Sequence, residues 1–270
     1  MTFDSNRAWN EASRAVSANK EVVLAIAGVF FLLPQLIFTF FFPAPEMAAG
    51  VTEKQVMEAV SAYYASILPV MIPVALCQAL GTLSLLSVLD TDRRPTVGEA
   101  IGNGLKGLLA YLLAQILMGF GLMTIGLAVA TLFMAAGGAV GAVIGVAIGL
   151  FLVIPVGVRL SLVGPVIAVD KWRNPIGALV RSWRLTQGNT ARIFGFYALL
   201  FLAMMVLMIL ANVVTLPISL LAPKHIAVLA GAVIESVLAS IMALYFVAVI
   251  GQVHRQLSGA SAETLTSPFE

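Results

Sequence analysis

Six apolar runs, each long enough to cross a lipid bilayer, constrain this chain more than any other feature of its sequence. They cover about residues 22–42, 63–89, 105–133, 137–169, 193–221 and 226–253; a glycine-rich turn separates the third from the fourth, and segments with polar residues separate the others. A helix needs roughly 20 apolar residues to span the hydrocarbon core. We therefore expect an all-α integral membrane protein with six transmembrane helices.

Composition supports the membrane assignment and excludes several other classes. Of the 270 residues, 60% are hydrophobic and only 10% are charged, whereas soluble domains are roughly 45–50% apolar and roughly 25% charged. The formal net charge of +2 is too small to indicate nucleic-acid binding. Cys77 is the single cysteine, so an internal disulfide is excluded, and two histidines without a Cys/His cluster predict no metal site.

The positions of the basic residues predict the orientation of the chain. Lys54, in the acidic loop 43–62, and Lys224, in the turn before the sixth run, are the only basic residues on one side. The remaining lysines and arginines lie on the opposite side. Cytoplasmic loops are enriched in lysine and arginine. Both termini are therefore predicted to be cytoplasmic, with residues 256–270 forming a short polar tail.

Residues 170–192, between the fourth and fifth runs, predict a basic amphipathic helix at the cytoplasmic surface. Asn174 can cap this helix, Pro175 can begin it and Gly188 can end it. Its apolar stripe is Ile176, Leu179, Val180 and Trp183. The residues expected to face lipid are Lys171, Arg173, Arg181, Trp183, Arg184 and Arg192. Such a helix contacts anionic inner-leaflet lipid in the headgroup plane; the alternative is a loop helix packed on its own protein.

Glycine recurs every fourth residue in the fourth run. The repeated positions are Gly137, Gly141, Gly145 and Gly149. Small residues at this spacing allow the backbone of a neighbouring helix to approach closely. We expect this face to pack against another helix of the same chain, and a homodimer face is the alternative.

Short polar matches indicate an internal repeat. Asp90-x-x-Arg93-x-Pro95 recurs as Asp170-x-x-Arg173-x-Pro175, and Gly102-Asn103-x-x-Lys106 recurs as Gly188-Asn189-x-x-Arg192. Thr96 and Glu99 also form a capping-box pattern that predicts a short helix. Together these matches predict a single membrane domain over residues 1–255. Its three parallel hairpin units, each with an interfacial helix, would be about 4–89, 90–169 and 170–255.

Polar residues inside the predicted spans are the candidate functional residues: Arg159, Gln78, Gln115, Asn212 and Glu235. Ionisable residues within a membrane are rare and indicate functional sites. A rise of 1.5 Å per residue places Arg159, Gln78 and Gln115 at a similar depth, roughly 16 Å from the cytoplasmic boundary. These three are predicted to form one polar layer, whereas Glu235 lies nearer the outer side with Asn212. Alternatively, Arg159 reaches the inner headgroups and Glu235 lies near the outer interface.

No catalytic constellation is recognisable in the sequence. Neither His225 nor His254 has a predicted partner, and no Ser-His-Asp set converges. We expect no enzyme activity and no cofactor. The expected function is non-enzymatic contact with membrane lipid or a membrane-protein partner, for example in envelope maintenance. The alternative is a transporter that moves a small or lipid-like solute through the polar layer around Arg159.

Two segments resemble known families. They are Arg159-Leu-Ser-Leu-Val-Gly-Pro165 and, after Asp170, Arg181-Ser-Trp-Arg-Leu-Thr-Gln-Gly-Asn189. They resemble the membrane domain of some glycerophosphoryl diester phosphodiesterases and the uncharacterised YciC-like inner-membrane proteins, with the same order of spans from about Trp9 to Leu257. The resemblance implies a bacterial inner-membrane location. It carries over no phosphodiesterase catalytic residue, because no position of this chain matches one.

Overall fold

A computed structural model describes residues 2–43, 50, 52–90 and 95–259 of the chain. Within these residues all regular secondary structure is helical, as the apolar runs predict. The elements are α1 (Ser5–Ala18), α2 (Lys20–Ala27), the π-helix η1 (Gly28–Leu32), α3 (Leu33–Phe41), α4 (Glu53–Asp90), α5 (Val97–Leu160), α6 (Val163–Ala168), α7 (Pro175–Thr186), α8 (Thr190–Leu221) and α9 (Lys224–Ser258).

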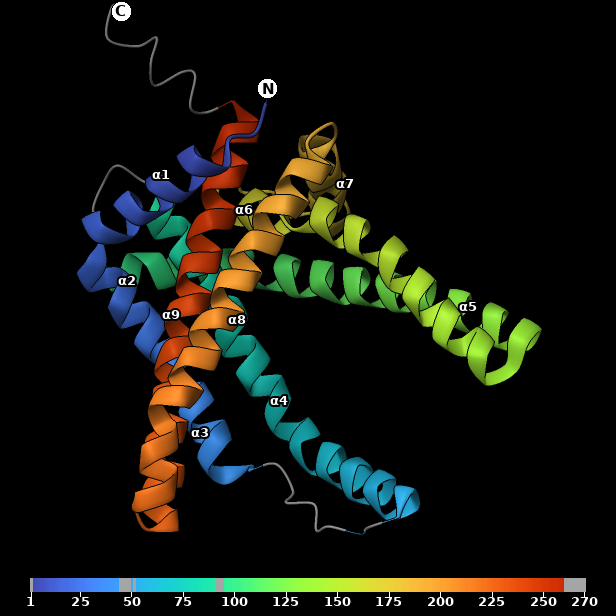
Figure 1. Ribbon diagram of the computed structural model, residues 1–270. Helices are drawn as coiled ribbons and strands as arrows, with labels where there is room; N and C mark the ends of the chain where they lie inside the picture. The colour runs from blue at the N-terminus through green and yellow to red at the C-terminus, as the bar shows by residue number, and fades with distance from the viewer. Residues whose placement is uncertain (1, 44–49, 51, 91–94, 260–270) are drawn as a thin grey trace, which may run out of the picture.

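Five helical stretches are long and apolar enough to cross a membrane. They are Lys20–Phe41, Glu53–Asp90, Val97–Ala168, Thr190–Ile218 and His225–Ser258. The third and fourth predicted spans both lie within Val97–Ala168, where the backbone leaves the helical conformation at Gly137 and Gly138. Gly138 has a φ of +59°, which glycine adopts readily because it has no Cβ. The chain turns back at this point, so α5 consists of two arms (Figure 1).

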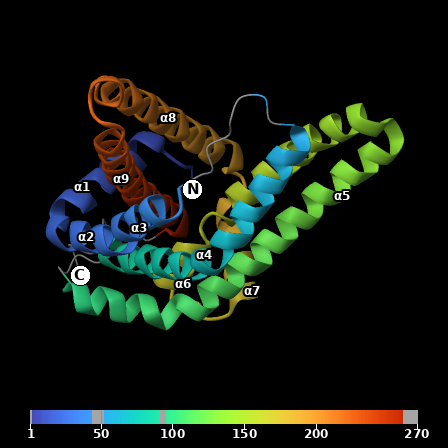
Figure 2. The same cartoon turned by 90° about the horizontal axis from the view of Figure 1, so that it is seen from below.

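The helices form three hairpins that diverge from a common base (Figure 1). The first contains α2, η1 and α3 followed by α4, the second consists of the two arms of α5, and the third contains α8 and α9. The base contains α1, α6, α7 and the end of α9. Figure 2, viewed from below, shows the arms of α5 extending away from α8 and α9. Segments far apart in sequence meet at the base, and η1 and α3 of the first hairpin also contact α9 of the third.

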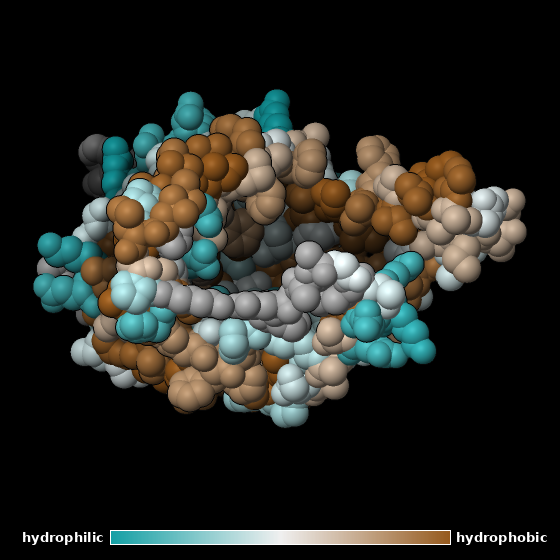
Figure 3. Space-filling view, turned by 60° about the horizontal axis from the view of Figure 1, so that its bottom comes forward, coloured by the Kyte–Doolittle hydropathy of each residue, from teal (hydrophilic) through white to brown (hydrophobic). Residues whose placement is uncertain are grey.

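The base contains most of the buried core, while the hairpins expose apolar side chains. The main buried cluster includes residues of α1, of the end of α4 and of the end of α9, among them Ala12, Leu86 and Val249. By contrast, only 11% of the most apolar window of α8 is buried within the protein. Figure 3 shows hydrophobic side chains covering much of the hairpin surface. Large exposed apolar surfaces are typical of proteins that contact a membrane.

Two local predictions differ from the structure. The capping box at Thr96 is present, since the Thr96 N–H donates to Glu99 Oε2 at 2.8 Å, but it opens α5 itself. No separate short helix forms, because the helix that begins at Val97 continues without a break through the first arm of α5. Residues 53–62 likewise form the first turns of α4. Residues 44–49, 51 and 91–94 lie outside the described part of the chain, and with them Arg93 of the repeat motif.

The glycines of the fourth predicted span lie against the other arm of α5. A Cβ at Gly141 would lie 2.0 Å from the carbonyl oxygen of Phe133, and one at Gly145 would lie 2.9 Å from the Cα of Ala130. Gly149 faces the backbone of the same arm, whereas Gly137 is at the bend and meets no atom within 4 Å. The close approach is therefore within this chain, between the two arms.

We predict that Gly145→Leu lowers the stability of the protein, because the larger side chain separates the arms of α5. Overpacking typically costs about 1–3 kcal/mol. Gly119→Leu is the matched control, since this exposed glycine of the first arm has no atom within 4 Å of its Cβ position. Thermal unfolding in detergent measures the difference, and equal melting temperatures for the two variants would contradict the packing.

Candidate functional site

The candidate site lies at the base, around the turn between α6 and α7. Asn174 caps α7, because its Oδ1 accepts hydrogen bonds from the N–H groups of Ile176 and Gly177 at 3.0 and 3.2 Å. Pro175 occupies the first position of the helix, where its missing N–H costs nothing. The ring of Trp172 lies against Gly177, where a Cβ would come within 2.8 Å of it. This packing fixes the direction in which α7 leaves the turn.

Asp170 links this turn to two helices. Its Oδ2 accepts a hydrogen bond from Arg181 Nε on α7, and its Oδ1 lies 3.3 Å from His254 Nε2 on α9. The side chains of Asp170 and His254 are 14% and 2% exposed. Burial by itself raises the pKa of the Asp170 carboxyl, but the contacts and charges of His254 and Arg181 outweigh burial. The pKa of Asp170 is consequently below its ordinary value.

The expectation that His254 lacks a partner is therefore wrong. Its Nε2 is close enough to Asp170 for an ion pair, although the two groups are not aligned for a hydrogen bond. The sequence contains one signal of this contact, because Gln252, His254 and Gln256 are polar residues near the end of an otherwise apolar helix. In the structure all three are buried. The Gln256 side chain accepts a hydrogen bond from the Asp4 N–H and donates one to the Asp4 carbonyl, fastening the N-terminus to α9.

Ser182 forms hydrogen bonds with backbone groups on both sides of the break between α5 and α6. Its hydroxyl donates to the carbonyl oxygen of Arg159 at 2.8 Å and accepts from the N–H of Leu162 at 3.2 Å. Thr186 Oγ1 donates to the same carbonyl at 3.2 Å. Backbone groups at a helix end need such partners when they are buried. The buried face of α7 therefore satisfies the backbone exposed where α5 ends.

Arg159 contacts the same helix through its side chain. Its Nε donates to Thr190 Oγ1 at 3.1 Å, and its guanidinium carbon lies 4.5 Å from the centre of the Trp183 ring. A cation at this distance over an indole is a favourable cation–π contact. The segments 159–165 and 181–189, which carry the family resemblance, thus pack against each other.

The five predicted intramembrane polar residues differ in their contacts and exposure. Gln115 Nε2 donates to the Tyr111 hydroxyl at 2.7 Å, whereas Arg159 is held by Thr190 and Trp183 at the base. Asn212 and Glu235 are exposed on the third hairpin, and Gln78 is half-buried on α4. The contacts of Arg159 and Gln115 do not assemble the predicted polar layer.

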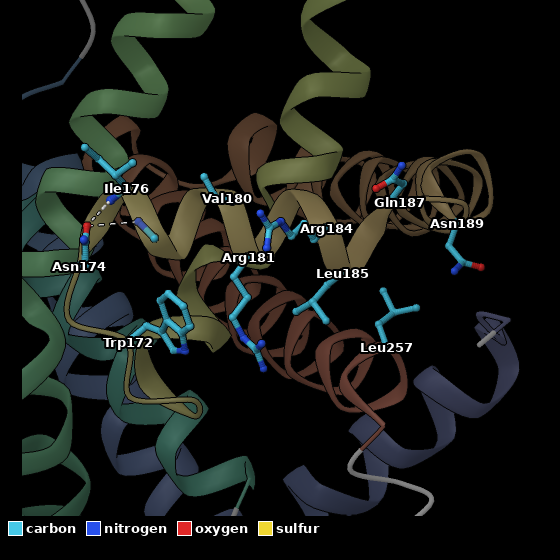
Figure 4. A pocket seen from close by; sticks show the side chains of 11 residues that line it. Trp172, Asn174, Ile176, Val180, Arg181, Arg184, Leu185, Gln187, Asn189 and Leu257 are labelled. Atoms are coloured by element: carbon cyan, nitrogen blue, oxygen red, sulfur yellow. Dashed lines mark hydrogen bonds between the residues drawn. The ribbon is translucent and has the colours of Figure 1, made fainter.

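The outer side of α7 combines positive charge with apolar side chains. We call the exposed basic residues of this region the basic surface; they are Lys171, Arg173, Arg184 and Arg192. Ile176 and Val180 are also exposed, at 62% and 45%. A pocket of about 690 Å³, the α7 pocket, lies beside them. Figure 4 shows Trp172 and Arg181 on one side of α7 and Ile176 and Val180 on the other.

Comparison with known proteins identifies the family but not an activity. The family described as "Domain of unknown function (DUF7847)" matches residues 7–257, which is most of the chain. The chain therefore belongs to this family. No curated protein and no solved structure matches it.

We predict that Asp170→Asn destabilises the protein, because Arg181 loses its counter-charge and His254 loses its carboxylate neighbour. Leaving charged or polar groups without a buried partner costs about 1–3 kcal/mol. The control is Glu58→Gln, since Glu58 is 67% exposed and lies 3.9 Å from Lys54. Melting temperatures of both variants and the parent provide the measurement.

The lowered pKa of Asp170 also predicts how the stability of the protein depends on pH. A carboxyl whose pKa is lower in the folded state stabilises the protein above its unfolded pKa, about 3.9 for aspartate. This contribution is lost as the pH falls through the lower, folded pKa. The stability difference between the parent and Asp170→Asn should therefore be largest near neutral pH and shrink below about pH 4. A difference that grows on acidification would contradict this assignment.

Proposed function

We propose that this member of the DUF7847 family is a six-span protein of the bacterial inner membrane that contacts anionic lipid through its basic surface and has no enzyme activity. The observation that supports this proposal most directly is the basic surface itself, where exposed cations adjoin exposed apolar side chains and a pocket of about 690 Å³. Phosphate headgroups and the adjoining acyl region offer the complementary chemistry at the inner leaflet.

The six-span proposal rests on the two arms of α5. The bend at Gly137 and Gly138 divides α5 into residues 97–136 and 139–160, and each arm exceeds the roughly 20 residues that a span requires. The three hairpins would then enter the membrane from the same side as parallel units. The distribution of lysine and arginine supports a cytoplasmic base with both termini inside.

The contacts of α7 favour some basic residues over others for lipid binding. Arg181 is held by Asp170, and the ring of Trp183 is covered by Arg159. We therefore assign the main lipid contacts to the exposed basic surface, with Arg181 and Trp183 orienting α7. The transporter alternative needs a solute path past Arg159, and the packing of Arg159 against Thr190 and Trp183 gives it less support.

The inner-membrane location follows from the resemblance of segments 159–165 and 181–189 to YciC-like proteins and to phosphodiesterase membrane domains. Envelope maintenance is one role that contact with lipid or a membrane-protein partner would serve. In this structure those segments form contacts between helices, which favours a shared membrane scaffold over shared chemistry.

Cysteine labelling tests the topology. With Cys77 removed, cysteines at Glu53, Ala136 and Lys224 should react with a membrane-impermeant reagent added from the periplasm, because each lies at or next to a hairpin tip. A cysteine at Arg184 should react only from the cytoplasmic side. If the cysteine at position 136 does not react from the periplasm, the two arms of α5 do not both cross the membrane and the six-span proposal fails.

Lipid dependence tests the proposed function. The purified protein should unfold at a higher temperature in nanodiscs of anionic lipid than in zwitterionic ones, with the difference shrinking in high salt, because charges are screened beyond about 8 Å at physiological salt. The double variant Arg184→Gln, Arg192→Gln should lose part of this difference, since each basic residue near such a surface contributes about 1 kcal/mol.

The matched control removes a positive charge from the other end of the molecule. Lys54 is 86% exposed at the start of α4, so Lys54→Gln should keep the full effect of anionic lipid. If the double variant keeps it as well, the basic surface does not bind lipid and the proposal fails.

A further inference from the structure

A second pocket, the hub pocket, lies where the three hairpins meet. Its volume is about 330 Å³, and residues of α4, both arms of α5, α6, α8 and α9 line it. It is separate from the α7 pocket, with which it shares no lining residue. Figure 3 shows that the molecule is hollowed between the diverging hairpins. Phe246 lines the hub pocket and is 38% exposed, so the pocket reaches the outer surface of the helices.

Paired polar groups face this otherwise apolar space. Gln115 Nε2 donates to the Tyr111 hydroxyl at 2.7 Å, and the hydroxyls of Ser161 and Tyr197 lie 3.2 Å apart. Because the Tyr111 oxygen accepts the bond from Gln115, its own O–H remains able to donate to a ligand. Tyr111 and Gln115 come from the first arm of α5, Ser161 from the α5–α6 break and Tyr197 from α8, so the tertiary fold brings the two pairs into one pocket.

The lining determines the charge of any occupant. Among the residues that the structure describes, no lysine, arginine, histidine, aspartate or glutamate lines the hub pocket. An ionised group brought into an apolar site without a counter-charge pays a large desolvation cost. A neutral molecule that carries a hydroxyl or carbonyl can instead exchange hydrogen bonds with the tyrosine, glutamine and serine side chains. The chemistry of the walls thus excludes the phosphate headgroups proposed for the basic surface.

The size of the pocket narrows the class further. Small-molecule sites usually measure roughly 300–1,000 Å³ and are mostly apolar with a few placed polar groups. At 330 Å³ the hub pocket is at the lower end of that range. It suits one apolar chain or ring system with a single polar end and is too small for a whole phospholipid.

We infer that the hub pocket binds an uncharged, single-chain amphiphile from the bilayer, whose hydroxyl or carbonyl oxygen hydrogen-bonds to Tyr111 and its neighbours. This site differs in position and ligand class from the lipid contact at the base. The proposal for the hub pocket would remain if lipid contact at the base were disproved. Lipid contact at the base would likewise remain if the hub pocket bound no amphiphile.

The test compares three probes that share a hydrocarbon chain and differ at one end: dodecanol, dodecane and dodecanoate. The full-length protein in zwitterionic nanodiscs is titrated with each probe, and its melting temperature is recorded, because a ligand that binds only the folded state raises this temperature. Dodecanol should give a saturable rise. Dodecane and dodecanoate should give smaller shifts, since one lacks the hydrogen-bonding group and the other is charged.

Two variants connect the effect to the pocket. Tyr111→Phe removes only the hydroxyl and should weaken dodecanol binding about tenfold, the effect of one lost hydrogen bond. Gly157→Phe should abolish binding by filling the pocket, since Gly157 lines it and has no atom within 4 Å of its Cβ position. The matched controls, Tyr64→Phe and Gly119→Phe, change exposed residues outside the pocket and should bind as the parent does.

Several results would overturn the inference. These are the absence of a shift with dodecanol, equal shifts with all three probes, or an unchanged shift in Tyr111→Phe. If Gly157→Phe does not fold, Tyr111→Phe still decides the question, because it keeps the size and shape of the side chain.

Discussion

The Asp170 carboxylate holds together the part of the structure on which the other features depend. It follows α6, accepts a hydrogen bond from Arg181 of α7 and lies against His254 near the end of α9. A buried carboxylate is costly unless charged or polar groups surround it, and here the Arg181 guanidinium and the His254 imidazole do so. The contact fixes α7 relative to α9. That orientation in turn places the basic surface and the α7 pocket on the outside of the base.

Burial is distributed unevenly because the two ends of the molecule face different surroundings. At the base, polar side chains such as Ser182 and Gln256 satisfy backbone groups that would otherwise be buried without partners. Along the hairpins, most backbone groups are satisfied within their own helix, apart from those at internal prolines such as Pro69 and Pro217 and at the bend of α5, so apolar side chains can face lipid. The α5 arms approach each other through Gly141 and Gly145, which replace side-chain packing with close backbone contact.

Residues 159–165 and 181–189 form a junction between helices at the base. Ser182 and Thr186 bind the carbonyl of Arg159, and Trp183 covers its guanidinium. A substitution at any of these positions would disturb the junction between α5, α6 and α7. The motif therefore describes how the base is assembled. The two proposed binding regions are formed by other residues: the exposed basic residues around α7 and the hydroxyl and amide groups of the hub pocket.

The sequence by itself determined the features that depend on local composition. Long apolar runs predicted an all-helical membrane protein. Asn174, Pro175 and the Thr96–Glu99 pair correctly predicted helix starts, because capping involves residues close in sequence. The spacing of Gly141 and Gly145 indicated a close helix contact, because small residues four apart lie on one face of a helix.

Only the tertiary structure decided which distant polar groups meet. Depth arithmetic grouped Arg159 with Gln115. In the structure Arg159 contacts Thr190 and Trp183 from other helices, whereas Gln115 donates to Tyr111 one turn earlier on its own helix. Hydrophobicity and helical rise specify how deep a residue lies, and they leave open the direction in which its side chain points around the helix axis. That direction is set by how the hairpins pack at the base, where residues as far apart as Asp170 and His254 come into contact.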